Sequence, residues 1–173
     1  MVRTIENKFY NIHFANSWNQ GIWNDFIDLH TEFIINADET KCISLDSTAM
    51  FVYIFINLYY KLLEVKASEK ELLSWKSYII DNHNDIIECV VEAILEKLGL
   101  IRACRAFGAV LIDTYGVNAS SFLLPLDELD RRYEVKLVNA ILTKSKQRNL
   151  KKFFWLSPWD ILLSLPKLIK NNL

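Results

Sequence analysis

Glycine and proline are scarce in this chain, and this scarcity limits the folds that it can adopt. Only four glycines and three prolines occur among 173 residues. Because turns between strands draw heavily on these two residues, the chain has little material for an all-β fold. Hydrophobic residues make up 51% of the chain, which is enough for one compact core. The sequence therefore predicts one all-α domain over residues 1–173, an orthogonal bundle of about seven helices with at most one short strand near 8–14.

The expected helices follow from apolar residues spaced three and four positions apart. Their expected ranges are 18–35, 44 or 46 to 65, 68–80, 85–98, 101–115, a segment that begins at Pro125 or Asp127, and 157–169. Ser68 and Glu71 form a capping-box pattern at the start of the third, and Gly99 and Gly116 are placed to end the fourth and fifth. The second is apolar almost all round and the fifth is rich in small residues, which predicts that both lie at the centre of the fold.

Five carboxylates recur at helical spacing in one stretch of the chain. They are Asp81, Asp85, Glu88, Glu92 and Glu96. Like charges at these offsets repel by a few tenths of a kcal/mol per pair, so a helix optimised for stability alone would carry lysines between them. If the helix starts after Asn84, Asp81 falls just outside the stripe. The spacing predicts an acidic binding face, with an ordinary solvated face as the alternative.

The charges of the chain are divided unevenly between its two parts. Residues 1–96 contain 15 acidic and 7 basic residues, whereas residues 97–173 contain 6 acidic and 13 basic residues. Asp25, Asp28 and Glu32 add further acidic positions in the first expected helix. Such a surface suits a basic protein partner, and aromatic residues among the acids are the expected hot spots. The aromatic candidates are Trp23, Trp75 and Tyr78.

The sequence shows no motif for catalysis or for metal binding. The three histidines, His13, His30 and His83, lack a ligand partner at HExxH or similar spacing, so we expect structural or surface roles for them. There is no GxSxG motif and no glycine-rich phosphate loop. We therefore expect no enzyme, no metal and no cofactor.

The cysteines and the hydropathy pattern indicate a cytoplasmic protein without a membrane span. Cys42, Cys89 and Cys104 are odd in number and lack CxxC spacing, which is typical of a reducing compartment. Cys89 and Cys104 lie among aliphatic residues and are expected to be small buried hydrophobes. The longest apolar run, 49–60, is too short to cross a bilayer.

A basic segment with aromatic residues lies near the carboxyl end of the chain. Its residues are Lys144, Lys146, Arg148, Lys151, Lys152 and Trp155. Cations beside aromatic rings suit a nucleic-acid strand or a membrane surface. The simpler interpretation is that the cations complement a helix dipole while the aromatics dock the last helix on the core.

Two arginines stand out in the otherwise apolar stretch 101–115. Arg102 and Arg105 are expected to reach solvent or to pair with a carboxylate such as Glu96 or Asp113, with an anion-binding site as the alternative.

These observations favour a non-enzymatic protein that binds and neutralises a basic protein partner, in the manner of a bacterial immunity protein or antitoxin. The alternative is a helical nucleic-acid-binding or regulatory domain that uses residues 144–155. An enzyme whose site is assembled from scattered residues stays open as a third interpretation.

Overall fold

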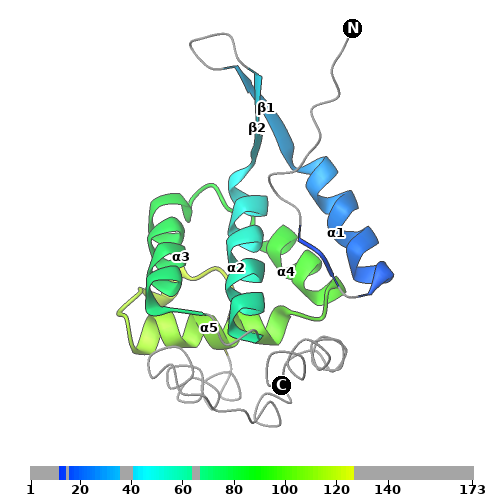
Figure 1. Ribbon diagram of the computed structural model, residues 1–173. Coiled ribbons are helices and arrows are strands. Elements are labelled where there is room, and N and C mark those ends of the chain that lie inside the picture. The colour runs from blue at the N-terminus through cyan, green and yellow to red at the C-terminus, as the bar shows by residue number, and fades with distance from the viewer. Residues whose placement is uncertain (1–11, 15, 36–40, 64–66, 127–173) are drawn as a thin grey trace, which may run out of the picture.

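The computed structural model of the chain is mostly helical, with one small antiparallel hairpin (Figure 1). It describes residues 12–14, 16–35, 41–63 and 67–126. Within these ranges the elements are α1 (Ser17–Leu29), β1 (Thr31–Ile35), β2 (Lys41–Leu45), α2 (Ser47–Leu63), α3 (Glu69–Asn82), α4 (Glu88–Lys97), α5 (Ile101–Asp113) and a 3₁₀ turn (Ala119–Ser121). The last two expected helices, after Pro125 and over 157–169, lie outside the described residues.

The helix α2 runs through the middle of the helical body, as its apolar sequence predicts (Figure 1). The helices α3 and α4 flank it on either side, and α5 crosses near the lower end of α2 and α3 in this view. Phe51, Phe55 and Ile56 of α2 are completely buried. The small residues of α5, including Ala103 and Ala106, are buried as well. The two helices expected at the centre are therefore the centre of the core.

An aromatic cluster joins α2, α3 and α5. The indole of Trp75 lies 5.3 Å from the ring of Phe51 and 5.5 Å from that of Phe55, measured between centroids. Phe107 of α5 packs edge-on against Phe55 at 5.8 Å. Phe122, beyond the 3₁₀ turn, meets Trp75 edge-on at 6.1 Å. Such tilted and edge-on pairs add a favourable term beyond burial and fix how these helices cross.

Local signals define several helix ends as expected. The backbone N–H of Ser68 donates to Oε2 of Glu71 at 2.8 Å, which is one half of the capping box at the start of α3. A hydrogen bond from Lys61 lowers the pKa of the same Glu71 carboxyl, and Ser68 adds to this effect. Gly99 and Gly116 have φ values of 71° and 67°, the left-handed conformation that ends a helix.

The expected helix over 18–35 is wrong at its carboxyl end. The helix α1 stops at Leu29, and residues 31–35 pair antiparallel with residues 41–45, so that Phe33 lies opposite Ile43. The apolar run Phe33–Ile35 fits a strand as well as a helix, and its β-branched residues favour the strand. The hairpin also contradicts the expectation of at most one short strand, and residues 12–14 are not a strand.

The expected start of the fourth helix is wrong by three residues. The helix α3 continues through Asp81 to Asn82, and the N–H of Asp85 donates to the carbonyl of Asn82 in a turn at 2.9 Å. The helix α4 starts at Glu88. Just before it, the N–H of Ile87 donates to Oγ1 of Thr48 at 3.0 Å. This tertiary hydrogen bond, made to a residue 39 positions away, fixes the start of α4.

None of the helices in the described residues combines the length and the apolar character needed to cross a membrane.

Candidate functional site

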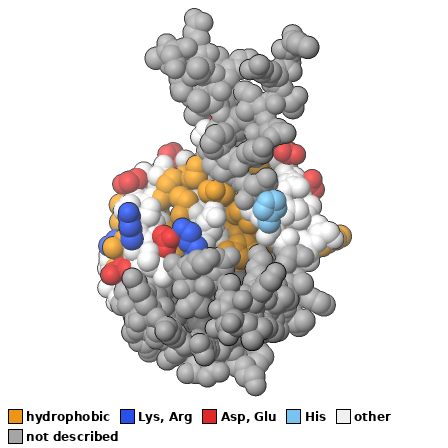
Figure 2. Space-filling model, viewed as in Figure 1, with side chains coloured by type: hydrophobic (Ala, Val, Ile, Leu, Met, Phe, Trp, Pro, Cys, Tyr) orange, Lys and Arg blue, Asp and Glu red, His pale blue; other side chains and the backbone are white. Residues whose placement is uncertain are grey.

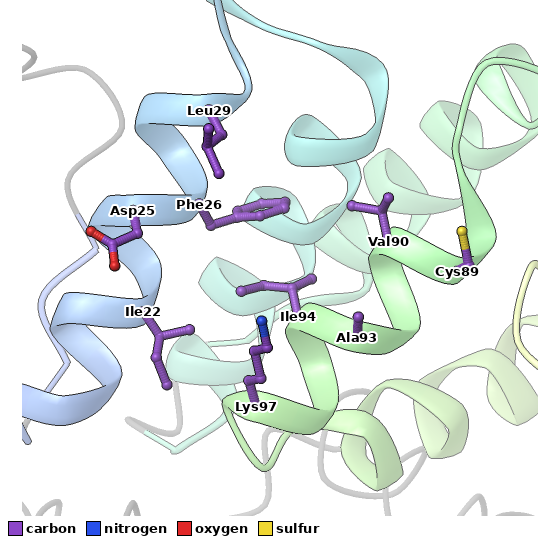
Figure 3. Close-up of a pocket in the computed structure, with 9 residues that line it drawn as sticks. All are labelled: Ile22, Asp25, Phe26, Leu29, Cys89, Val90, Ala93, Ile94 and Lys97. Atoms are coloured by element: carbon purple, nitrogen blue, oxygen red, sulfur yellow. The ribbon is translucent and has the colours of Figure 1, made fainter.

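A shallow groove lies between α1 and α4 (Figure 3). The two helices are antiparallel, because Asn19 near the start of α1 donates from Nδ2 to the carbonyl of Leu98 just past the end of α4 at 3.3 Å. The groove has a volume of about 290 Å³ and is open to solvent. It is lined by Ile22, Asp25, Phe26, Leu29, Cys89, Val90, Ala93, Ile94 and Lys97. We call this feature the α1–α4 groove.

The floor of the α1–α4 groove is apolar. Phe26 of α1 and Ile94 of α4 are 7% and 5% exposed, and Figure 3 shows the phenyl ring of Phe26 directed across the groove toward Val90. Leu29, at the end of α1, is 82% exposed although it borders this floor. Scattered exposed leucines are ordinary, but one beside an apolar hollow enlarges a continuous apolar surface.

Two charged side chains line the groove from opposite walls. Lys97 reaches into the groove from α4, and the carboxylate of Asp25 points outward from α1 (Figure 3). No ion pair joins them, nor does either form one with another residue in the part of the chain that the structure describes. The two charges therefore do not neutralise each other at contact distance.

Carboxylates continue along the outer side of each wall. On α4, the row Glu88, Glu92 and Glu96 lies outside the groove lining, and its member Glu92 reaches Arg105 of α5. On α1, exposed Asp28 follows Asp25 by three positions. Of these acids only Glu92 has an ion pair with a described residue, which leaves the other exposed carboxylates available to a partner.

The structure divides the five-carboxylate stripe among three segments. Asp81 lies in the last turn of α3, Asp85 lies in the following turn, and only Glu88, Glu92 and Glu96 share one helix. Figure 2 shows acidic side chains dispersed around the edges of one face, with hydrophobic side chains exposed between them. A single continuous acidic stripe is therefore wrong.

Glu92 has an internal partner. Its Oε1 accepts from Nη2 of Arg105 on α5 at 3.1 Å, with both side chains partly exposed. A carboxylate partner for Arg105 was expected, but the partner is Glu92 and not one of the two acids that the sequence suggested. Arg102 is exposed.

The three aromatic residues expected as hot spots on the surface are buried or partly buried. Trp75 is 0% exposed in the aromatic core and Trp23 is 1% exposed, so neither presents its ring to solvent. Tyr78 is half-buried, and its hydroxyl donates to the carbonyl of Ser47 at 3.2 Å. Burial raises the pKa of the Tyr78 hydroxyl, with smaller effects from its neighbours. Glu32 is exposed on β1.

The hairpin brings together a histidine and an aspartate that sequence reasoning did not pair. Nδ1 of His30, just after α1, lies 2.5 Å from Oδ2 of Asp46, just before α2. Oδ1 of Asp46 accepts from the N–H of Ala49 at 2.8 Å and so caps α2. The ring of His30 also packs on Phe26, with centroids 4.4 Å apart. The partners are 16 positions apart, so the sequence could have indicated this pair only if the hairpin that joins them had been predicted.

The two described cysteine side chains differ in burial. Cys104 is buried in α5 as expected, whereas Cys89 is exposed on the wall of the groove, which contradicts the expectation that it is a buried hydrophobe. No group of three or more potential metal-ligating side chains occurs within the described ranges. The basic segment 144–155 and its six candidate residues lie outside them.

Comparison with known proteins identifies no family. No protein-family model matches the chain, and searches of curated proteins and of solved structures found no significant match.

Proposed function

We propose that this protein binds and neutralises a basic protein partner through the acidic faces of α1 and α4, as an immunity protein or antitoxin does. The observation that carries this proposal is the composition of the α1–α4 groove. Exposed Asp25 lines the groove, and exposed Asp28, Glu88 and Glu96 lie on the same two helices outside its lining; none of the four has an ion pair within the described residues. The floor of the groove is apolar.

The two parts of this surface would contribute differently to binding. Carboxylates exposed to solvent steer a basic partner toward the groove and speed association, but they add little affinity each. The apolar floor around Phe26 and Ile94 can supply affinity when a partner side chain covers it. The combination suits a fast-binding inhibitor of a protein that is itself basic, such as one that acts on nucleic acid.

We place this activity in the cytoplasm. The exposed thiol of Cys89 and the buried thiol of Cys104 form no disulfide with each other. An exposed thiol such as that of Cys89 suits a reducing compartment, and an inhibitor that protects the cell producing a toxin has to act where that toxin is made.

The test compares two charge-reversed variants of the full chain. One carries Asp25→Lys, Asp28→Lys and Glu88→Lys, and the control carries Lys144→Glu, Lys146→Glu and Arg148→Glu. Each tagged protein captures partners from the cells that produce it naturally, and a captured protein is identified, purified and used to measure association rates at low and high salt. Reversal at α1 and α4 should slow association by about tenfold or more at low salt, with a smaller effect at high salt.

The control variant should retain the partner. If it loses the captured protein while the acidic-face variant keeps it, the proposal is wrong and a function of the basic segment takes its place. The neighbouring genes give an independent check, because an adjacent toxin gene is expected for an immunity protein or antitoxin.

A further inference from the structure

We infer that two copies of this chain associate through α1, with α1 of one copy packed antiparallel on α1 of the other. This inference goes beyond the proposed function, because it concerns the protein without its partner. It rests on a row of residues along α1, namely Trp18, Ile22, Asp25 and Leu29, which we call the α1 seam. The exposure, the spacing and the charges of this seam each support a second copy as its occupant.

The α1 seam carries the two most exposed large hydrophobic side chains in the described part of the chain. Trp18 is 76% exposed and Leu29 is 82% exposed. Ile22, which lies between them, is half-buried. A single exposed side chain of this kind is ordinary, but three on one row of a helix form an apolar patch that association would remove from water.

The spacing of the α1 seam is the spacing by which helices pair along their length. Its members are separated by four, three and four positions, so they lie on one line along α1. This alternation is the pattern that two packed α-helices use at their contact. Gly21 borders the seam, and a Cβ built there would have no neighbour within 4 Å, so this side of α1 is open to a second helix.

The α1 seam is symmetric about its midpoint. In an antiparallel pair related by a twofold axis at this midpoint, Trp18 of one copy faces Leu29 of the other, and Ile22 faces Asp25. The two most exposed apolar side chains then cover each other at both ends of the interface. A parallel pair would place Asp25 against Asp25, which is unfavourable because like charges repel. The seam therefore favours the antiparallel arrangement.

The charges beside the α1 seam are self-complementary. Asp25 and Lys97 are the charged residues that line the α1–α4 groove, and neither has an ion pair among the residues described. The hydrogen bond of Asn19 with Leu98 places Lys97 beside the first half of α1, and Figure 3 shows its side chain level with Ile22. In the antiparallel pair, Asp25 of the other copy comes to this same level. Each copy thus offers one carboxylate and one ammonium group, which meet twice across the axis.

The size of the α1 seam makes this a weak and reversible association. A helix of 13 residues is about 20 Å long, and an interface built on one such helix from each copy lies at the small end of protein interfaces. Asp25 belongs both to the seam and to the surface proposed for a basic partner. Self-association and partner binding therefore exclude each other, and a basic partner would separate the two copies.

The experiment measures the mass of the full chain in solution by sedimentation equilibrium. Between about 1 µM and about 1 mM, the parent should pass reversibly from monomer to dimer. Asp25→Lys and Lys97→Asp should each weaken the dimer by about tenfold or more, because each change places like charges at both charged sites of the interface. Thermal unfolding identifies any variant whose folding is impaired, and the apolar variants below then carry the test.

An equal mixture of the two charge variants tests the reciprocal contact directly. In a dimer of one Asp25→Lys chain with one Lys97→Asp chain, each charged site again holds one carboxylate and one ammonium group. The mixture should therefore associate about tenfold more strongly than either variant alone. A chain that carries both changes should self-associate as the parent does. A mixture that associates no better than its components would show that Asp25 and Lys97 do not meet across the interface, and the inference would be wrong.

Apolar variants test the same interface independently. Trp18→Ala and Leu29→Ala should each raise the dissociation constant of the dimer by about tenfold, whereas Ile80→Ala, at an exposed position of α3, should raise it by less than about twofold. A parent that stays monomeric up to about 1 mM, or a dimer that Trp18→Ala and Leu29→Ala leave intact, overturns the inference. Neither outcome affects the proposed function, whose test depends on a captured partner.

Discussion

At the scale of single residues, Gly108 shows how closely the centre of the fold is packed. A Cβ atom built at Gly108 would lie 2.1 Å from Cζ of Phe122, so the phenyl ring occupies the space of the missing side chain. Phe122 is itself held edge-on against Trp75. The absence of a side chain at Gly108 is therefore a requirement of α5 packing, and not of backbone conformation.

We predict that Gly108→Ala destabilises the protein. Overpacking usually costs about 1–3 kcal/mol, and the better helix propensity of alanine offsets up to about 1 kcal/mol of that loss. Gly21→Ala in α1 is the matched control, because a Cβ there would have no neighbour within 4 Å. The control should gain about 0.5–1 kcal/mol in the free energy of unfolding, measured by urea denaturation. Equal effects at the two sites would contradict the packing of Phe122 on α5.

A second prediction concerns Tyr78 at alkaline pH. Burial raises the pKa of its hydroxyl above the usual value near 10, with added effects from Asp46 and Asp85. Since the folded pKa is above the unfolded one, the stabilising contribution is complete below pH of about 10 and is lost as pH rises through the folded pKa. The free energy of unfolding should therefore fall more steeply at alkaline pH for the parent than for Tyr78→Phe, and parallel pH profiles would contradict this.

Sequence reasoning was accurate at positions where the signal is local. The capping box at Ser68 and the helix ends at Gly99 and Gly116 depend on neighbouring residues only, and all three are confirmed. It failed where tertiary packing decides the environment. Trp75 was expected among surface acids but is buried against α2 and α5, and Cys89 was expected inside but lies on the groove wall.

At the scale of elements, the hairpin between α1 and α2 is the largest difference from the sequence prediction. The run Phe33–Ile35 is apolar at consecutive positions and so does not distinguish a strand from a buried helix face. At the base of the hairpin, His30 and Asp46 are joined by side-chain and backbone hydrogen bonds. Sequence periodicity holds no information on such a contact.

We predict that Asp46 contributes through two separable interactions. Asp46→Asn keeps an N-cap acceptor for Ala49 but removes the charge beside His30, whereas Asp46→Ala removes both. The alanine variant should lose about 1–2 kcal/mol more in unfolding free energy than the asparagine variant, as loss of an N-cap does. Chemical denaturation of the two variants measures the difference. Equal stability would show that Asp46 does not cap α2.

The acidic row of α4 supplies a further prediction, because its members differ in their surroundings. Glu92→Lys removes the partner of Arg105 and places two cations together, whereas Glu96→Lys changes an exposed carboxylate with no ion pair among the described residues. The first change should cost about 1–3 kcal/mol and the second no more than about 0.5 kcal/mol. Thermal unfolding compares them, and an equal loss would contradict the α4–α5 ion pair. Glu92 is accordingly left out of the charge reversal that tests function.

At the scale of the whole molecule, composition and periodicity predicted a mostly helical chain with two particular helices at its centre. The described residues confirm both points. Composition and periodicity did not predict the antiparallel packing of α1 on α4. This packing joins segments about 70 residues apart through contacts such as that of Asn19 with Leu98. The candidate site lies at this non-local junction, so the groove between the two helices could not be predicted from the sequence.

The last prediction concerns the triple reversal Asp25→Lys, Asp28→Lys and Glu88→Lys. All three side chains are exposed, so each change should alter the free energy of unfolding by about 0.5 kcal/mol or less. Glu88 also loses a favourable interaction with the amino end of α4, worth about 0.3–1 kcal/mol. A total loss below about 2 kcal/mol, measured by thermal unfolding, would show that any binding defect is a surface effect. A larger loss would mean that these carboxylates stabilise the fold.

The hydrogen bond from the N–H of Asp46 to the carbonyl of His30, at 3.1 Å, closes the chain at the base of the hairpin. The two ends of the segment 31–45 therefore lie side by side. The contact between the end of α1 and the start of α2 does not depend on how long that segment is. In evolutionary terms, this is a position at which related chains can vary in length while the core and the α1–α4 groove stay unchanged.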